Sequence, residues 1–245
     1  EREAKSGYTV SATMRCTTDM KICGITRPAD VYMAQQAGAS HFGTIVEIPR
    51  SPRSVSVATA IALREETRLP QVCVMESTDP AQVEAVIRQV RPAAVQLHGC
   101  TDAGCAHDLR AIMPPQVELW LAVGLPAAAS QCTTSVTALT SSIAEYATAG
   151  VARIVLDTLS GGHTGGTGQT SDWTLAAKGV AVSPLPIMLA GGISPENVTE
   201  AVRSVKPAGI DVSSGVEQTP GVKDEAKLML LAARFREAVA EQRRH

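Results

Sequence analysis

The chain has 245 residues, a length that is ordinary for one α/β barrel and sufficient to bury a core without disulfide or metal cross-links. Its composition, 44% hydrophobic and 19% charged with only 3% aromatic residues, is that of a soluble globular protein with an aliphatic core. The net charge of −2 gives no general attraction to nucleic acids or anionic membranes, so a local site must hold any anionic ligand.

The N-terminal residues 1–19 mix charged with small polar side chains and lack the apolar stretch of a signal peptide. We interpret them as a tail or an expression remnant, followed by one catalytic domain over residues 20–245. No segment approaches the roughly 18 uninterrupted apolar residues of a membrane span. The six cysteines show no repeated spacing, so we expect free thiols in a reducing cytoplasm and no metal site.

Eight short apolar segments recur along the chain, and each has the length of a buried parallel strand. Most are apolar on consecutive positions, as expected where both faces of a sheet are covered. They span residues 20–25, 40–48, 71–76, 93–99, 117–124, 153–158, 186–192 and 208–215.

The segments between these strands have helical features. The helix after the third strand has Thr78 or Asp79 as its N-cap, and the one after the seventh has Ser194. Residues 224–242 form the longest and most amphipathic helix, which would close an outer ring. Eight strand and helix units in strict alternation predict a single-domain α/β fold, a (β/α)8 TIM barrel, with an open doubly wound sheet as the alternative.

Small residues follow the last two predicted strands. Gly191 and Gly192 directly precede a helix, and Ser213, Ser214 and Gly215 follow the next strand. Backbone N–H groups freed by glycine, together with a helix N-terminus, form an anion site without needing net positive charge. Because barrels characteristically bind phosphate on the loops after strands seven and eight, we predict a phosphate site here.

The longest glycine-rich stretch, residues 161–170, follows the sixth predicted strand. It contains neither a G-x-G-x-x-G fingerprint nor a phosphate-binding Walker lysine. Its composition fits a mobile lid over the substrate and fits an ordinary surface loop equally well.

Reactive side chains stand at or just after strand ends, where barrels place their active sites. Asp157 ends an aliphatic run, and an aspartate there is a candidate general acid with a raised pKa. Asp211 ends the eighth strand. For Cys23 and Arg53, residue type alone favours a buried structural cysteine and an exposed loop arginine. For His98, a hydrogen-bonded structural role fits the residue type at least as well as a catalytic one.

The chain resembles the phosphoribosylanthranilate isomerase family from about Met20 to Arg236. Seven motifs carry the resemblance, and they occur in the family's order. They are KICGIT (21–26), SPRSV (51–55), VQLHG (95–99), LDT (156–158), GGTGQTSDW (165–173), AGGISPENV (190–198) and DVSSGVEQTPGVKD (211–224).

The resemblance implies a cofactor-free barrel that carries out an Amadori rearrangement in tryptophan biosynthesis. N-(5-phosphoribosyl)anthranilate would become 1-(2-carboxyphenylamino)-1-deoxyribulose 5-phosphate. The family's general base corresponds to Cys23 and its general acid to Asp157, and a thiolate base requires a pKa lowered toward neutral. Substrate-binding positions follow from the resemblance and from the strand-end list: Arg53 at the anthranilate end, His98, Gly191, Gly192, Asp211, Ser213, Ser214 and Gly215.

Three positions depart from the family's usual pattern. Glu47 and Glu76 stand where aromatic or neutral residues are common, and Leu121 stands where a lysine is common. Either the two glutamates point outward and the substrate carries anthranilate, or they face the pocket and select a neutral or cationic amine.

Two other functions compete with the tryptophan-pathway isomerase. One is a sister aminosugar-phosphate isomerase of the histidine pathway or of secondary metabolism, although the histidine-pathway enzyme has an aspartate where Cys23 stands. The other is a barrel that only binds a sugar phosphate, which would have no use for both an acid and a base. We expect a small phosphorylated aminosugar as the partner, no nucleic acid or membrane, and a monomer or homodimer.

Overall fold

A computed structural model describes residues 19–126, 136–160, 163–164 and 172–244. Eight parallel strands form a closed barrel, because β1 pairs with both β10 and β2. The prediction of a (β/α)8 barrel is confirmed, and the open-sheet alternative is wrong. The barrel strands are β1 (Asp19–Ile22), β2 (His41–Val46), β4 (Gln71–Met75), β5 (Ala94–Leu97), β6 (Glu118–Pro126), β7 (Arg153–Ser160), β9 (Ile187–Leu189) and β10 (Gly209–Val212).

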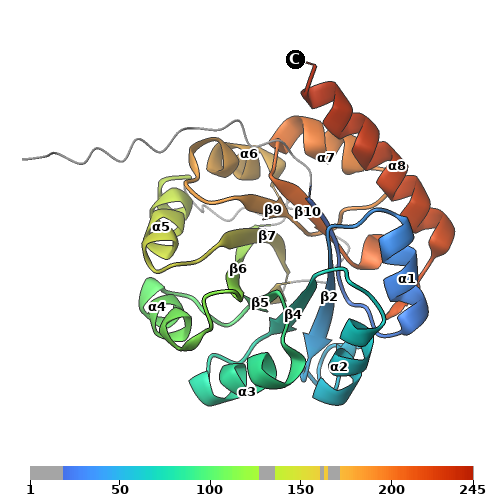
Figure 1. The fold of residues 1–245 in the computed structure, drawn as a ribbon. Coiled ribbons are helices and arrows are strands. Elements are labelled where there is room, and N and C mark those ends of the chain that lie inside the picture. The colour runs from blue at the N-terminus through green and yellow to red at the C-terminus, as the bar shows by residue number, and fades with distance from the viewer. Residues whose placement is uncertain (1–18, 127–135, 161–162, 165–171, 245) are drawn as a thin grey trace, which may run out of the picture.

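Helices surround this barrel as an outer ring (Figure 1). They are α1 (Pro28–Gln36), α2 (Val57–Glu65), α3 (Pro80–Val90), α4 (Ala103–Ile112), α5 (Val136–Thr148), α6 (Trp173–Val182), α7 (Val198–Val205) and α8 (Glu225–Gln242). The last of these is the longest and packs along α7 and α1, so it completes the ring as expected.

One predicted N-cap is right and another is wrong. The Asp79 carboxylate accepts the backbone N–H of Ala81 and caps α3. Ser194 does not cap α7, which begins only at Val198 with Asn197 at the N-cap position. The Asn197 side chain instead accepts the N–H of Ser194 and donates to the carbonyl of Gly192, and these bonds fold the segment into a turn before the helix.

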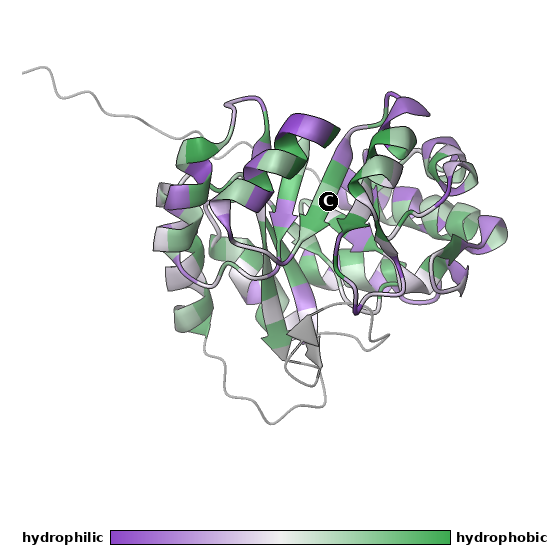
Figure 2. Cartoon of the chain, turned by 90° about the horizontal axis from the view of Figure 1, so that it is seen from below, coloured by the Kyte–Doolittle hydropathy of each residue, from purple (hydrophilic) through white to green (hydrophobic). Residues whose placement is uncertain are grey.

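Alternating residues along the strands supply two separate cores. Ile22, Phe42 and Leu97 belong to the large cluster between strands and helices. A second cluster of Val72, Ala94, Trp120, Val155, Met188 and Ala190 belongs to the alternate positions and fills the barrel interior. The strands are mostly hydrophobic, whereas the surrounding helices alternate hydrophobic with hydrophilic residues (Figure 2).

Short accessory strands decorate the barrel. The strand β3 (Ser54–Val55) extends β2 in parallel, and β8 (His163–Thr164) folds back on β7. After β10, the 3-10 turn η1 (Ser214–Val216) leads into a hairpin of β11 (Glu217–Thr219) and β12 (Val222–Lys223). Sequence patterning did not indicate this hairpin, and it proves central to the pocket described below.

Some predictions concern residues beyond those that the structure describes. The interpretation of residues 1–19 as a tail and the proposed lid at 161–170 fall largely on such residues, as do Cys16 and Cys132. Within the described ranges, Cys23, Cys73, Cys100 and Cys105 are all free thiols, as expected. None of the helices described is long and apolar enough to cross a membrane.

Candidate active site

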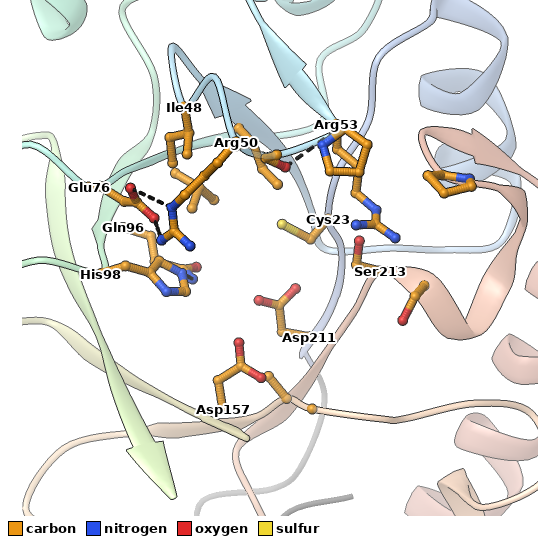
Figure 3. A pocket seen from close by; sticks show the side chains of 18 of the residues that line it. Cys23, Ile48, Arg50, Arg53, Glu76, Gln96, His98, Asp157, Asp211 and Ser213 are labelled. Carbon is orange, nitrogen blue, oxygen red and sulfur yellow. Dashed lines mark hydrogen bonds and ion pairs between the residues drawn. The ribbon is translucent and has the colours of Figure 1, made fainter. Parts of the chain in front are cut away.

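A pocket of about 360 Å³ opens at the carboxyl ends of the barrel strands. Its wall brings together nine of the ten residues proposed from sequence: Cys23, Arg53, His98, Asp157, Gly191, Gly192, Asp211, Ser213 and Ser214. The tenth, Gly215, does not line the pocket but packs directly behind it. Figure 3 shows the polar side chains converging on one central space.

Cys23 and Asp157 face this space from different strands. Cys23 follows β1, and Asp157 lies in β7, which two strands, β10 and β9, separate from β1 around the barrel. In Figure 3 the thiol and the Asp157 carboxyl approach from opposite sides, with Asp211 between them. A sugar held in the pocket would therefore present different faces to the thiol and to the carboxyl.

The Asp157 carboxyl has the ionisation of a general acid. Burial raises its pKa from 3.8 to about 6, although a hydrogen bond from the Thr158 backbone N–H to Oδ1 (2.7 Å) favours the charged form. The neighbouring charge of Asp211 acts in the same direction as burial. A carboxyl with a pKa near 6 can hold and release a proton close to neutral pH.

The Cys23 thiol differs from expectation. Burial raises its pKa above the ordinary value of 9.0, and the cations Lys21 and Lys223 offset only part of this shift. Burial therefore moves the pKa of Cys23 away from the neutral range that a thiolate base requires. The thiol is only 8% exposed, and loss of solvation outweighs the two lysines.

Beneath the thiol lies a buried polar layer. The Lys21 ammonium donates to Gln96 Oε1 (2.9 Å) and to Asp211 Oδ2 (2.7 Å). Burial alone would lower the pKa of Lys21, but Asp211 and Cys23 outweigh it, and the pKa is raised. Lys21 is therefore a fixed positive charge at the floor of the pocket.

Arg53 is buried, not exposed as residue type alone suggested, and its guanidinium is already bound. Its Nε donates to both carboxylate oxygens of Glu217 (2.8 and 3.1 Å), and its Nη2 donates to Oε2 (2.7 Å). The Glu217 carboxylate also accepts a hydrogen bond from Lys223 Nζ (2.8 Å). Gly24 leaves room for this arrangement, because a Cβ there would lie 2.6 Å from Arg53 Cδ.

The loops after β9 and β10 meet beside the pocket. Gly191 and Gly192 adopt left-handed conformations, with φ of 81° and 67°. A side chain at Gly215 would collide with the Ile193 carbonyl, so that glycine lets the two loops touch. Among the described residues, the buried Ser213 Oγ and Asp211 Oδ1 have no hydrogen-bond partner, which marks them as groups that a ligand would satisfy.

The opposite side of the pocket carries Arg50, Glu76 and His98. Arg50 and Glu76 form an ion pair at the pocket edge, and His98 lies beside Gln96 (Figure 3). Burial lowers the pKa of His98 to about 4, so its imidazole is neutral at physiological pH. Glu47 is exposed and does not line this pocket.

Sequence reasoning missed four charged residues of this region: Lys21, Arg50, Glu217 and Lys223. A signal existed for Lys21, because it stands two positions before Cys23 on a buried strand and must share its face. No comparable pattern marked Glu217 or Lys223, which lie in a hairpin that only the tertiary fold brings to Arg53.

Comparisons with known proteins decide between the remaining functions. The family model for N-(5'-phosphoribosyl)anthranilate (PRA) isomerase matches residues 20–234. The chain belongs to this family. Its activity is accordingly that of a PRA isomerase of tryptophan biosynthesis. The N-(5'-phosphoribosyl)anthranilate isomerase of Bordetella pertussis is 40% identical over 225 residues, which cover 88% of this chain and 94% of the relative.

Solved structures of PRA isomerases share the fold. A monomeric form generated from the dimeric enzyme of Thermotoga maritima has a TM-score of 0.73 and 28% identity, covering 90% of this chain and 99% of that one. A PRA isomerase in complex with reduced 1-(o-carboxyphenylamino)-1-deoxyribulose 5-phosphate has a TM-score of 0.72 and 26% identity, with the same coverage. The family thus includes dimeric forms and a structure with a bound analogue of the reaction product.

Proposed function

We propose that the isomerisation proceeds with Asp157 as general acid and Cys23 as general base. The observation that supports this most strongly is the pair of proton-transfer groups facing each other across one pocket, with the Asp157 pKa raised to about 6. The Amadori rearrangement needs one proton delivered and another removed, and two separate groups meet that requirement.

The protonated Asp157 donates its proton to the furanose ring oxygen, and the C1′–O bond breaks. The electron pair of the amine nitrogen forms the C1′=N bond, which gives an iminium cation. Cys23 as thiolate then removes the proton from C2′, the C–H electrons form the C1′=C2′ bond of an enolamine, and the C1′=N π electrons return to the nitrogen. Tautomerisation moves a proton to C1′ and gives the 2-ketone.

The cationic intermediate explains how a thiol with a raised pKa can act as the base. Burial disfavours the thiolate, whereas a positive charge beside it favours ionisation. The iminium supplies that charge when the base is needed. Lys21 beneath the thiol acts in the same direction throughout.

We further propose that the substrate phosphate lies on the loops after β9 and β10. The left-handed glycines and the unsatisfied Ser213 hydroxyl support this position. The anthranilate carboxylate would then lie toward Arg53, on the same side as Cys23, and the neutral His98 would offer a hydrogen bond to the substrate.

We make three further proposals, on the domain, the location and the oligomeric state. We propose residues 20–245 as the catalytic domain, which the match over residues 20–234 supports. We propose a cytoplasmic location, where tryptophan biosynthesis takes place. We propose a monomer or a homodimer, since dimeric relatives exist.

The roles are tested with Cys23→Ser and Asp157→Asn in a fluorescence assay that follows loss of PRA generated in situ. Each variant removes one proton transfer worth roughly 10²–10⁴ in rate, so we expect kcat to fall at least about a thousandfold. KM should change far less, because neither side chain anchors the substrate. Near-normal turnover by Cys23→Ser would show that the base lies elsewhere.

A further inference from the structure

The β11–β12 hairpin buries a carboxylate directly against Arg53. Glu217 is 7% exposed and comes from a segment 164 positions away in sequence, yet it accepts three contacts from the Arg53 guanidinium. A buried carboxylate of this kind either stabilises the fold alone or fixes the guanidinium for a purpose. The surroundings of the pair distinguish these possibilities.

Glu217 is itself held from its far side. Lys223 Nζ donates to Oε1 at 2.8 Å and to the Ser213 carbonyl at 3.2 Å, and the Gly221 N–H approaches Oε1 at 3.3 Å. Burial alone would raise the pKa of the Glu217 carboxyl, but Arg53 and Lys223 outweigh it and hold the pKa below its usual range. The carboxylate is therefore ionised and has little freedom to rotate.

The guanidinium keeps donors for a ligand. An arginine carries five N–H groups, and Glu217 engages the Nε–H and one N–H of Nη2. Arg53 also lines the pocket, beside Cys23 and Ser213 (Figure 3). Its remaining donors thus have a fixed plane and direction, which is what bidentate recognition of a planar carboxylate requires.

We infer that Glu217 is a positioning residue, which sets the plane of the Arg53 guanidinium and thereby selects substrates that carry an aryl carboxylate. This inference rests on the proposed function, because it takes Arg53 to meet the anthranilate carboxylate. Glu217 acts through Arg53 and makes no contact with the substrate. Lys223 completes the anchor by holding the carboxylate from behind.

The experiment compares two substrates of the same enzyme. One is PRA, and the other is the phosphoribosylamine made from aniline, which lacks the carboxylate. In Glu217→Gln we expect KM for PRA to rise about 10- to 100-fold, the size of one lost charge-assisted hydrogen bond. KM for the aniline compound should stay within about threefold of wild type, because no carboxylate is there to be positioned.

A double-mutant cycle tests whether Glu217 acts through Arg53. Arg53→Lys removes the planar fork, so Glu217→Gln should add little to KM in that background, giving strong non-additivity. The matched control is Asp30→Asn, which breaks another carboxylate–guanidinium fork, between the buried Asp30 of α1 and its N-cap residue Arg27, neither of which lines the pocket. We expect that control to keep the wild-type preference for PRA.

Glu217→Gln leaves the buried Lys223 without its carboxylate. A second variant, Glu217→Gln with Lys223→Met, is therefore made alongside it, because it buries no unpaired ammonium. Circular dichroism establishes which of the two folds, and the substrate comparison is made on it. An equal rise in KM for both substrates, or additive effects with Arg53→Lys, would overturn the inference. Failure of the wild type to convert PRA would instead refute the proposed function.

Discussion

At the scale of single residues, the proposed acid Asp157 has a lower pKa than the proposed base Cys23. Asp157 has a pKa of about 6, and the pKa of Cys23 lies above its ordinary value of 9.0. The proposed reaction needs Asp157 protonated and Cys23 ionised. In the free enzyme between these two values the carboxyl is mostly ionised and the thiol mostly neutral, so only a minor fraction has the reactive arrangement.

This arrangement predicts distinct pH profiles of kcat/KM. The wild type should give a broad bell, because the minor reactive form is a constant share of the enzyme between the two pKa values. Residual activity of Asp157→Asn should rise with pH to beyond 9, following the thiolate alone. Residual activity of Cys23→Ser should fall above about pH 6, following the protonated carboxyl. The opposite slopes would mean that the acid and base roles are exchanged.

The raised pKa of Asp157 is also a statement about stability. Its folded-state pKa of about 6 exceeds the ordinary 3.8, so folding loses stability as pH rises through this interval. Asp157→Asn keeps an acceptor for the Thr158 N–H without the buried charge. We expect this inactive variant to be about 1–3 kcal/mol more stable at pH 8, with no gain at pH 4.

Urea denaturation at the two pH values measures this difference. The control is Asp108→Asn, an exposed carboxyl on α4 that should change little at either pH. A loss of stability in Asp157→Asn at pH 8 would mean that the carboxylate is stabilised by contacts other than those described. The difference between the two pH values distinguishes the cost of burying the ionised Asp157 carboxyl, which is present only at pH 8, from a packing effect, which would be the same at both.

At the scale of elements, the phosphate site is a contact between two loops. The loop after β9 and the turn η1 after β10 approach closely only because Gly215 has no side chain. Gly215→Ala would press a methyl group against the Ile193 carbonyl and push the loops apart. We expect KM for PRA to rise at least about tenfold, as when one good hydrogen bond to phosphate is lost, with a smaller change in kcat.

Gly104→Ala in α4 is the matched control for this substitution. Its new Cβ would lie 3.1 Å from a carboxylate oxygen of the N-cap residue Asp102, and no residue of α4 lines the pocket. KM should therefore be unchanged there. Equal KM values for Gly215→Ala and the wild type would move the phosphate away from these loops.

The elements also show which features a single sequence can predict. Apolar runs located all eight barrel strands, because parallel strands covered on both faces are apolar throughout. The Ser194 cap failed because the Ser194 hydroxyl accepts the N–H of Glu196 in a turn before the helix, and α7 begins only after Asn197. The β11–β12 hairpin was missed, since its short strands carry no apolar period and its role depends on Arg53, 164 residues earlier.

At the scale of the whole molecule, the pocket has two different halves. The side formed by β1, β7, β9 and β10 carries the thiol, the acid and the glycine loops that strand-end reasoning identified. The side formed by β2, β4 and β5 carries Arg50, Glu76 and His98. Strand order could place residues at the mouth, but only the structure separated Glu47, which is exposed, from Glu76, which lines the pocket.

That separation leads to the last prediction, on substrate preference. Glu76 faces the pocket but is paired with Arg50, so the two side chains present no net charge to an incoming carboxylate. Glu76→Gln would leave Arg50 uncompensated and attract the anthranilate carboxylate. Both side chains are substantially exposed, so the gain is that of a surface ion pair: KM for PRA should fall about two- to fivefold, with kcat unchanged.

Steady-state kinetics of Glu76→Gln and Glu47→Gln, at low salt and at about 0.5 M salt, test this expectation. High salt should erase the gain in Glu76→Gln, because the attraction between exposed charges is screened. Glu47→Gln should match the wild type under both conditions, since its carboxylate does not line the pocket. A weaker affinity for PRA in Glu76→Gln would mean that Glu76 holds Arg50 in the position that the substrate needs, and that the pair acts as one unit in recognition.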